Sequence, residues 1–158
     1  MAIVVNKPLP EFEANATGGS KVTNTSHVGQ IVVLYFYPKD NTPGCTTQAC
    51  EFRDDIFEAR KANAVILGVS VDDVESHKKF AEEHGLPFSL LADASKETAK
   101  RYGVLMKRGE MEIANRVTFL IDPQGKIVKR YDVTPQLLNG HSKAVLADIA
   151  SMSGKKSG

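Results

Sequence analysis

The amino-acid sequence predicts an α/β fold in which helices flank a mixed central β-sheet. Residues 31–37, IVVLYFY, form a continuous run of β-branched and aromatic residues, the pattern of a strand buried on both faces. Strand-like runs then alternate with segments of helical periodicity. Towards the carboxyl end, two more strand-like runs flank the turn sequence DPQG and predict an antiparallel hairpin. We expect a single domain over residues 1–153 and a flexible tail over residues 154–158.

The same patterns give each element a range. From Thr46 onward, Ala49, Phe52, Ile56 and Ala59 recur at helical spacing and predict an amphipathic helix. The other predicted strands are 64–72, 88–93, 114–122 and 126–132, and the other predicted helices are 73–85, 96–103 and 142–152. Buried strands in alternation with helices, followed by a hairpin and a terminal helix, are compatible with a thioredoxin-like fold.

The composition is ordinary for a globular protein. Hydrophobic residues make up 42% and charged residues 25% of the chain, and the net charge is +1. This balance gives no reason to expect nucleic acid or a membrane as a partner, and no apolar run reaches the ~20 residues that span a bilayer. The start, MAIVVNKPLPEF, lacks the features of a signal peptide, so we expect a cytoplasmic protein and interpret the sequons at Asn15 and Asn24 as chance. In that compartment a disulfide is more often catalytic than structural.

Both cysteines of the chain, Cys45 and Cys50, lie at the start of the first predicted helix. They could be two unrelated buried thiols, because free cysteine is among the most buried residue types. A metal site is not expected, because the spacing of the cysteines and histidines does not match zinc ligation. The four histidines are interpreted as structural or surface residues: His27, His77, His84 and His141.

The position of Cys45 favours chemistry. Pro43 and Gly44 place it in the first helical turn, where unpaired N–H groups and the helix dipole favour an anion such as a thiolate. A thiolate alone does not make a fast enzyme, because the nucleophilicity of a thiolate falls as the pKa of the thiol falls. Any rapid reaction at Cys45 therefore needs further stabilisation of its transition state.

The spacing of the two cysteines constrains any bond between them. In an α-helix, residues five positions apart have Cα atoms ~8.6 Å apart, whereas a disulfide requires less than about 7 Å. A disulfide between Cys45 and Cys50 therefore cannot form while the helix is intact. If it forms, we expect oxidation to lower the helix content around residues 45–52.

The segment YPKDNTPGCTTQAC resembles the active-site segment of the peroxiredoxins, whose pattern Pro-x-x-x-Thr/Ser-x-x-Cys is met by Pro38, Thr42 and Cys45. A second cysteine five residues on resembles the bacterioferritin comigratory protein, or Q-type, group. KPLPEF, VILGVSVD, FSLLAD and RVTFLIDPQGKI resemble other segments of that family, and Arg116 in the last of these matches its active-site arginine. The resemblance implies a thioredoxin-like fold.

The resemblance also implies a catalytic cycle that reduces hydrogen peroxide and organic hydroperoxides. Cys45 is expected to be the peroxidatic thiolate that becomes a sulfenic acid, and Cys50 the resolving thiol that forms an intramolecular disulfide. Thioredoxin or a glutaredoxin-like dithiol is expected to restore the thiols. No metal or organic cofactor is implied. A monomer is expected, because resolution within one chain needs no partner subunit.

The remaining site residues are assigned by the same resemblance. Thr42 is expected to hydrogen-bond the peroxide and Arg116 to polarise it, with the N–H groups of Gly44 and the following cysteine facing its oxygens. Pro38 is expected to shield the pocket and Gln48 to orient the arginine. The residues themselves leave simpler alternatives: Thr42 as a helix cap, Arg116 as an outward strand residue, and Pro38 as the end of a strand.

Two other classes of protein compete with a peroxidase. A dithiol–disulfide oxidoreductase is disfavoured because the usual Cys-x-x-Cys pair is absent. A redox sensor or holdase could use a switch between Cys45 and Cys50. Neither class needs a peroxide pocket, so Thr42 and Arg116 distinguish them from a peroxidase.

Overall fold

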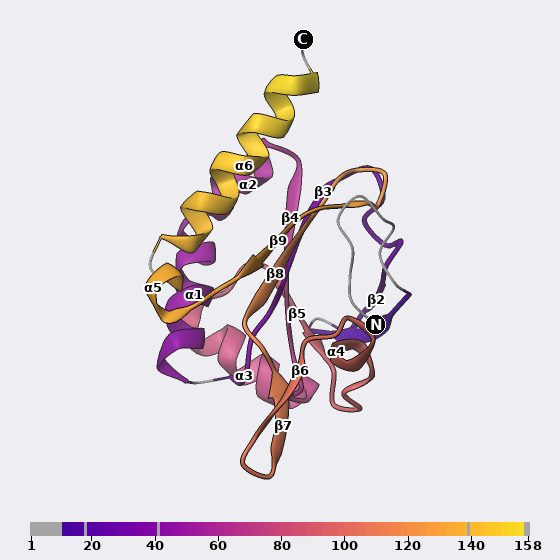
Figure 1. The fold of residues 1–158 in the computed structure, drawn as a ribbon, viewed down its shortest axis with the longest axis vertical. Helices are drawn as coiled ribbons and strands as arrows, with labels where there is room; N and C mark the ends of the chain where they lie inside the picture. Colours follow the sequence, from indigo (N-terminus) through magenta and orange to yellow (C-terminus); the bar gives the residue numbers. More distant parts are fainter. Residues whose placement is uncertain (1–10, 18, 41, 139, 157–158) are drawn as a thin grey trace.

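The predicted α/β class is confirmed by the computed structural model, which describes residues 11–17, 19–40, 42–138 and 140–156 (Figure 1). Most of the KPLPEF segment therefore lies outside the described residues. The strands are β1 Glu13–Ala16, β2 Lys21–Thr23, β3 Ile31–Phe36, β4 Ala64–Ser70, β5 Ser89–Ala92, β6 Leu105–Arg108, β7 Met111–Ala114, β8 Val117–Ile121 and β9 Ile127–Asp132. The helices are α1 Pro43–Asp54, α2 Ile56–Lys61, α3 Val74–His84, α4 Glu97–Arg101, α5 Pro135–Leu138 and α6 His141–Lys156.

The central sheet is mixed, as predicted. Among the described residues it holds seven strands in the order β2-β1-β5-β4-β3-β8-β9, and β6 pairs with β7 in a separate hairpin. Strand β4 runs parallel to both β3 and β5, whereas β8 is antiparallel to β3 and to β9. The predicted hairpin at the DPQG turn is therefore present as β8–β9. Strand β3 is an interior strand of the sheet, with β4 on one side and β8 on the other.

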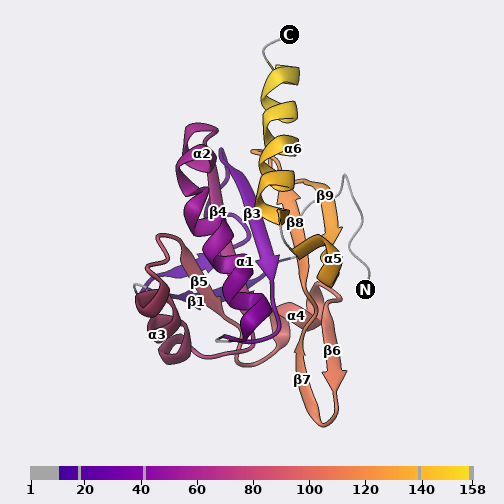
Figure 2. The same cartoon turned by 90° about the vertical axis from the view of Figure 1, so that its left-hand side faces the viewer.

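Two apolar layers cover the faces of the sheet. Helices α1, α2, α3 and α6 lie on one face, whereas α4 lies on the other, where side chains of the edge strands β1 and β2 join the apolar layer (Figures 1 and 2). Along β3, Val33 and Tyr35 enter the helix-covered layer, and Val32, Leu34 and Phe36 enter the opposite one. Successive side chains of a strand point to opposite faces, so burial of both faces explains why the sequence of β3 is apolar throughout.

Several boundaries differ from those predicted. The apolar periodicity begins at Thr46, but the first helix already begins at Pro43, which agrees with the predicted place of Cys45 in the first turn; the helix breaks at Asp55 into α1 and α2. Residue Ala114 belongs to β7, so β8 begins only at Val117 and Arg116 lies in the connection between them. Helix α6 continues to Lys156, beyond the start of the predicted tail. The extent of the domain, residues 1–153, stays a prediction.

Three elements were not predicted. The hairpins β1–β2 and β6–β7 consist of strands of three or four residues, too short to show a clear alternation of apolar and polar side chains. Helix α5 has four residues, about one turn. Short elements of this kind are held by tertiary contacts rather than by their own periodicity.

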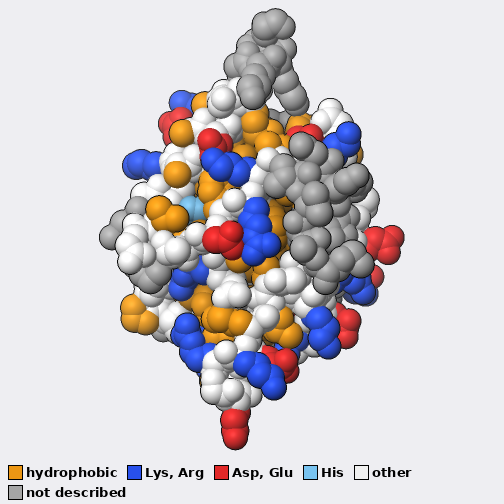
Figure 3. Space-filling model, viewed as in Figure 1, with side chains coloured by type: hydrophobic (Ala, Val, Ile, Leu, Met, Phe, Trp, Pro, Cys, Tyr) orange, Lys and Arg blue, Asp and Glu red, His pale blue; other side chains and the backbone are white. Residues whose placement is uncertain are grey.

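The surface carries a mixture of charges. Figure 3 shows basic and acidic side chains interspersed on one face, with exposed hydrophobic side chains between them. Within the described residues, no helix is both long enough and apolar enough to cross a bilayer.

Candidate active site around Cys45

The site begins where β3 ends and α1 starts. Pro38 is buried, and Thr42 occupies the N-cap position with an extended backbone, φ −91° and ψ 150°. The Thr42 side chain makes no capping hydrogen bond; its hydroxyl instead donates to the carbonyl oxygen of Lys39 at 2.9 Å. Capping is therefore not the role of this side chain. The first helical hydrogen bond runs from the Thr46 N–H to the Thr42 carbonyl, at 2.9 Å.

Cys45 lies in the first turn of α1 and is only 1% exposed. The backbone N–H groups of Gly44 and Cys45 precede the first helical hydrogen bond, so they have no partner within the helix. Both groups belong to the positive end of the helix dipole. Cys45 therefore lies in the first turn of a helix, as the sequence predicts.

Arg116 reaches this sulfur from the connection between β7 and β8. Its Nη2 donates to the Cys45 Sγ at 3.3 Å, and its Nη1 donates to the Gln48 Oε1 at 2.8 Å. The backbone of Arg116 is held by a 2.9 Å bond from the Val133 N–H to its carbonyl oxygen. The side chain is therefore not an outward-facing strand arginine. The guanidinium places a positive charge next to the Cys45 sulfur.

Gln48 orients this arginine without neutralising it. The side chain is 1% exposed, and its Oε1 accepts one of the two guanidinium bonds just described. Its Nε2 is buried and has no hydrogen-bond partner in the described part of the chain. Because an amide carries no net charge, the full charge of Arg116 remains available to the sulfur and to a bound ligand.

Gly44 makes room for the guanidinium. A Cβ at this position would lie 3.0 Å from Arg116 Nη2 and 3.4 Å from Leu138 Cδ2. Contacts as short as 3.0 Å would force the arginine to move. The sequence reasoning assigned only the N–H of Gly44 to the site and missed this steric requirement, which depends on residues far away in the chain.

A pocket of about 620 Å³ opens over these residues. Its wall includes four of the seven predicted site residues: Pro38, Thr42, Gly44 and Arg116. The rest of the lining comes from β6, from the β7–β8 connection and the start of β8, and from the end of β9 through α5: Met106, Arg108, Asn115, Val117, Asp132, Val133, Thr134 and Leu138. None of these eight residues was predicted as a site residue, and β6 and α5 are short elements that the sequence pattern did not reveal.

Cys50 is a free, half-buried thiol on the same uninterrupted helix as Cys45. With α1 intact, ideal helix geometry keeps the two Cα atoms ~8.6 Å apart. The structure is therefore of a reduced, fully wound state, and a disulfide between these residues requires part of α1 to open.

His141 lies behind the site at the start of α6. Its Nε2 is 2.9 Å from the Thr118 hydroxyl, and the ring packs edge-on against Phe52 and Tyr131. Burial, with a smaller contribution from the charge of Arg116, lowers the pKa of His141 to about 4. The imidazole is therefore neutral near pH 7 and adds no charge to the site.

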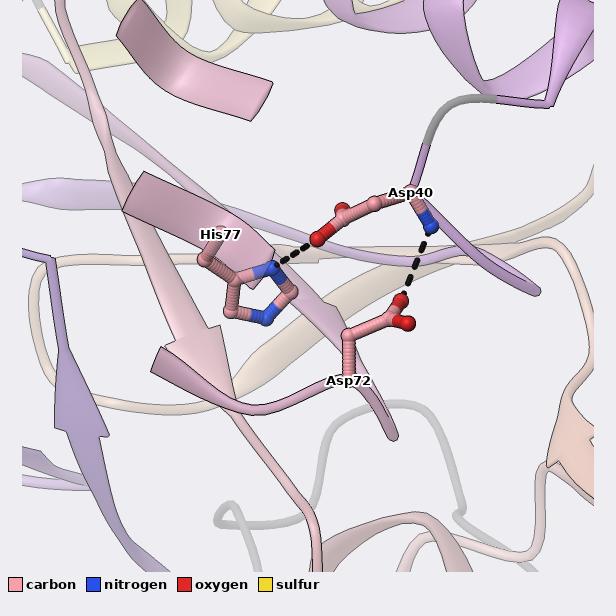
Figure 4. Close-up of side chains that lie close together, drawn as sticks. All are labelled: Asp40, Asp72 and His77. Atoms are coloured by element: carbon pink, nitrogen blue, oxygen red, sulfur yellow. Dashed lines mark hydrogen bonds and ion pairs between the residues drawn. The ribbon is translucent and has the colours of Figure 1, made fainter. Parts of the chain in front are cut away.

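Another group of ionisable side chains lies beyond Pro38. Asp40, Asp72 and His77 bring three potential metal-ligating atoms within 4.8 Å of one another, from the described residues (Figure 4). The facing carboxylate oxygens of Asp40 and Asp72 each accept two hydrogen bonds from protein donors, and both ring nitrogens of His77 face protein oxygens. The lone pairs that a cation would need are already engaged, so the group is a hydrogen-bonded network.

The fold and the site together define a class of protein: a thioredoxin-fold protein with a buried cysteine at a helix amino terminus, in contact with an arginine from the connection between two strands. The AhpC/TSA family model matches residues 5–130, and the chain belongs to that family.

Known relatives agree with this assignment. The chain is 40% identical over 159 residues to peroxiredoxin Bcp of Bacillus subtilis, covering 98% of this chain and 100% of that protein. A cysteine variant of PrxQ from Xylella fastidiosa matches with a TM-score of 0.89 and 30% identity, covering 96% and 98% of the two chains. The Xanthomonas campestris bacterioferritin comigratory protein, solved as trapped intermediate and ligand complexes in a study of its alkyl peroxide reduction, matches with a TM-score of 0.82 and 34% identity, covering 89% and 91%.

The predicted class of activity is therefore correct. The chain is a peroxiredoxin-type thiol peroxidase, which uses a peroxide as its substrate and a thiol as its reductant.

Proposed function

We propose that Cys45 is the peroxidatic residue of this enzyme. The observation that carries the proposal is the 3.3 Å contact of Arg116 Nη2 with a sulfur in the first turn of α1. The thiolate attacks one oxygen of a hydroperoxide ROOH and breaks the O–O bond. The sulfur becomes a sulfenic acid, and the departing alkoxide takes up a proton to leave as ROH.

Thr42, Arg116 and two backbone amides supply the transition-state stabilisation that a thiolate alone lacks. The hydroxyl proton of Thr42 is engaged by the Lys39 carbonyl, so its oxygen is left to accept a hydrogen bond from the peroxide O–H. Arg116 and the free N–H groups of Gly44 and Cys45 are donors for the peroxide oxygens. Donors fixed in advance around a leaving oxygen stabilise its developing charge.

Pro38 and the pocket determine access to the sulfur. Pro38 is buried in the pocket wall and limits the approach of water to the thiolate. The apolar side chains of Met106, Val117, Val133 and Leu138 offer a surface for the carbon chain of an organic hydroperoxide. We therefore include both hydrogen peroxide and organic hydroperoxides in the proposed substrates.

We propose Cys50 as the resolving residue. After part of α1 unwinds, the Cys50 thiol attacks the sulfenic acid, a disulfide forms and water leaves. Thioredoxin or a glutaredoxin-like dithiol then reduces the disulfide by exchange. The half-buried position of Cys50 on the intact helix supports this order of events, because the two thiols can meet only after the helix opens.

The experiment that tests this function is peroxide consumption coupled to thioredoxin, thioredoxin reductase and NADPH. The Cys45→Ser variant is expected to consume no peroxide, whereas Cys50→Ser is expected to consume one equivalent and then stop. A first turnover by Cys45→Ser at the rate of the unmodified enzyme would refute the assignment. Repeated turnover by Cys50→Ser at an unchanged rate would refute the resolving role.

We also propose that the enzyme works as a cytoplasmic monomer. Resolution within one chain needs no second subunit, and the mass in solution, measured by sedimentation at working concentration, tests this. A stable dimer whose dissociation abolishes turnover would contradict it.

A further inference from the structure

We propose that Asp40 and His77, with the hydroxyl of Tyr37, are positioning residues for the peroxide pocket. Their hydrogen bonds hold the chain that leaves β3 in one conformation and thereby aim Thr42. This inference rests on the proposed function, since it concerns the rate at which Cys45 reacts with peroxide.

The centre of the network is buried. The side chains of His77 and Asp40 are 0% and 1% exposed. The Asp40 Oδ1 accepts from the Tyr37 hydroxyl at 2.6 Å, and the Oδ2 lies 2.7 Å from the His77 Nδ1 and accepts from the Ser76 hydroxyl at 2.8 Å. A buried carboxylate is expensive unless each oxygen is hydrogen-bonded, and here each one is.

The backbone of Asp40 is held as well. Its N–H donates to the Asp72 Oδ2 at 2.8 Å, and the same oxygen accepts from the Ser70 hydroxyl at the end of β4 (Figure 4). The residue is therefore tied to β4 through Asp72 and to α3 through His77. Neither cysteine and no residue of the pocket wall takes part in these bonds.

His77 extends the network to a third element. Its Nε2 faces the carbonyl oxygen of Leu91 in β5 at 2.8 Å, and its Nδ1 faces the Asp40 carboxyl at 2.7 Å. Both ring nitrogens are therefore engaged, and the ring joins β5 to the chain that leaves β3.

The network reaches the pocket through one neighbouring residue. Lys39 precedes Asp40, and the Lys39 carbonyl accepts the Thr42 hydroxyl proton at 2.9 Å. Fixing Asp40 therefore fixes the acceptor that orients Thr42. If Asp40 is released, the Thr42 hydroxyl can turn away, and the peroxide loses an aligned acceptor.

A conservative variant separates an effect on the orientation of Thr42 from an effect on the stability of the fold. Asp40→Asn keeps the shape of the side chain: its amide oxygen can accept from the Tyr37 hydroxyl, and its NH2 group can donate to a neutral His77 Nδ1 and to the Ser76 hydroxyl oxygen, so each contact is kept with the Ser76 bond reversed. Asp40→Ala cannot rebuild them. We measure the rate constant for oxidation of the Cys45 thiol by hydrogen peroxide in a single turnover, and the urea midpoint of each reduced variant.

We expect Asp40→Ala to react roughly tenfold more slowly and Asp40→Asn to stay within about twofold of the unmodified enzyme. The matched control is Asp148→Ala, which also removes a carboxylate bonded to a tyrosine hydroxyl, that of Tyr131, but on α6. It is expected to lower the urea midpoint and to leave the rate unchanged.

Three outcomes would overturn the proposal: an unchanged rate in Asp40→Ala, an Asp40→Asn variant as slow as Asp40→Ala, or an equal slowing by Asp148→Ala. If Asp40→Ala does not fold, Tyr37→Phe decides, since it removes only one donor to Asp40. A slowing of about threefold supports the proposal, and an unchanged rate rejects it. Loss of peroxidase activity in Cys45→Ser is independent of these results, so failure of this inference leaves the proposed function standing.

Discussion

At the scale of single residues, the site depends on close approach. The guanidinium of Arg116 lies where a side chain at position 44 would crowd it, and it is oriented by a neutral Gln48 rather than by a carboxylate. A second residue, Tyr35, is buried at 0% exposure between the sheet and α1 with a hydroxyl that has no partner in the described part of the chain. Each of these features makes a separate prediction.

Gly44→Ala is expected to slow the reaction of Cys45 with peroxide roughly tenfold, because the added Cβ displaces a charged donor from the sulfur. Alanine is a better helix former than glycine by ~1 kcal/mol, so a loss of helix stability cannot explain the slower rate. Single-turnover thiol titration measures the rate, and circular dichroism is the control for helix content. A rate equal to that of the unmodified enzyme would show that the guanidinium accommodates the methyl group.

Tyr35→Phe is expected to raise the free energy of unfolding by about 1 kcal/mol, because an unpaired buried hydroxyl costs roughly 1–3 kcal/mol. The phenol lies over Gly68, where a Cβ would come within 2.9 Å of its oxygen, and beside the Phe52 ring at 4.8 Å. Urea denaturation of the reduced protein measures the change. The matched control is Tyr131→Phe, which removes a hydroxyl bonded to Asp148 and is expected to destabilise. A destabilised Tyr35→Phe would mean that the hydroxyl has a partner.

At the scale of elements, α1 is attached to the start of α6 just beyond the two cysteines. Its first turn has neither a side-chain cap nor an acidic residue, two features that stabilise helix starts. Near its end, the Glu51 carboxylate accepts from the Gly140 N–H at 3.1 Å, and Asp55, just after the helix, accepts from the Ser142 hydroxyl at 2.5 Å. Residues 45–52, which are expected to open, therefore lie before the Asp55 attachment to α6.

Oxidation to the disulfide is expected to remove amide-exchange protection around residues 45–52 while protection in α6 remains. The reason is geometric, since the Cα atoms must close from ~8.6 Å to less than about 7 Å. Hydrogen exchange of the reduced and oxidised proteins, with Cys50→Ser treated identically as the control, measures it. Full protection of this segment in the oxidised protein would contradict the unwinding argument.

At the scale of the whole molecule, the sheet brings distant parts of the chain to one place. Strand β3 leads to α1, which carries Cys45, and the β7–β8 connection supplies Arg116. Helix α6, which begins at His141, packs in the helix-covered apolar layer. The stability of the fold depends on pH through the buried, neutral His141, because the imidazole binds a proton more readily in the unfolded chain than in the folded one.

The free energy of unfolding is expected to fall as the pH falls from about 6.5 to about 4, because the folded pKa of His141, about 4, lies below its usual value. The shift corresponds to a loss on the order of 3 kcal/mol, complete near pH 4 and absent above pH 7. Urea midpoints at pH 7.5 and pH 4.5 measure it. His141→Asn is the control: it is expected to be less stable at pH 7.5 and to lose less on acidification. An equal loss in both proteins would assign the effect to other groups.

The residues that carry local signals were predictable. The buried run of β3, the helix of Cys45 and the β8–β9 hairpin follow from periodicity and turn chemistry. The family resemblance pointed to Gln48 through the segment around Cys45 and to Arg116 through RVTFLIDPQGKI. The pocket wall from β6 and α5 was not predictable, because elements of four residues have no readable period. The bond of Asp40 to His77 was equally hidden, since the two residues are 37 positions apart and Asp40 occupies a variable position of the motif.

The sequence by itself determined the class of fold, the helix that holds Cys45 and the incompatibility of an intact helix with a bond to Cys50. Each of these depends on neighbours along the chain, where spacing translates directly into geometry. The donors that reach the sulfur, the lining of the pocket and the bonds that hold the segment before Thr42 became known only from the tertiary structure. Arg116 and Cys45 are 71 positions apart and Asp40 and His77 are 37 apart, so their distances are set by how the layers pack on the sheet.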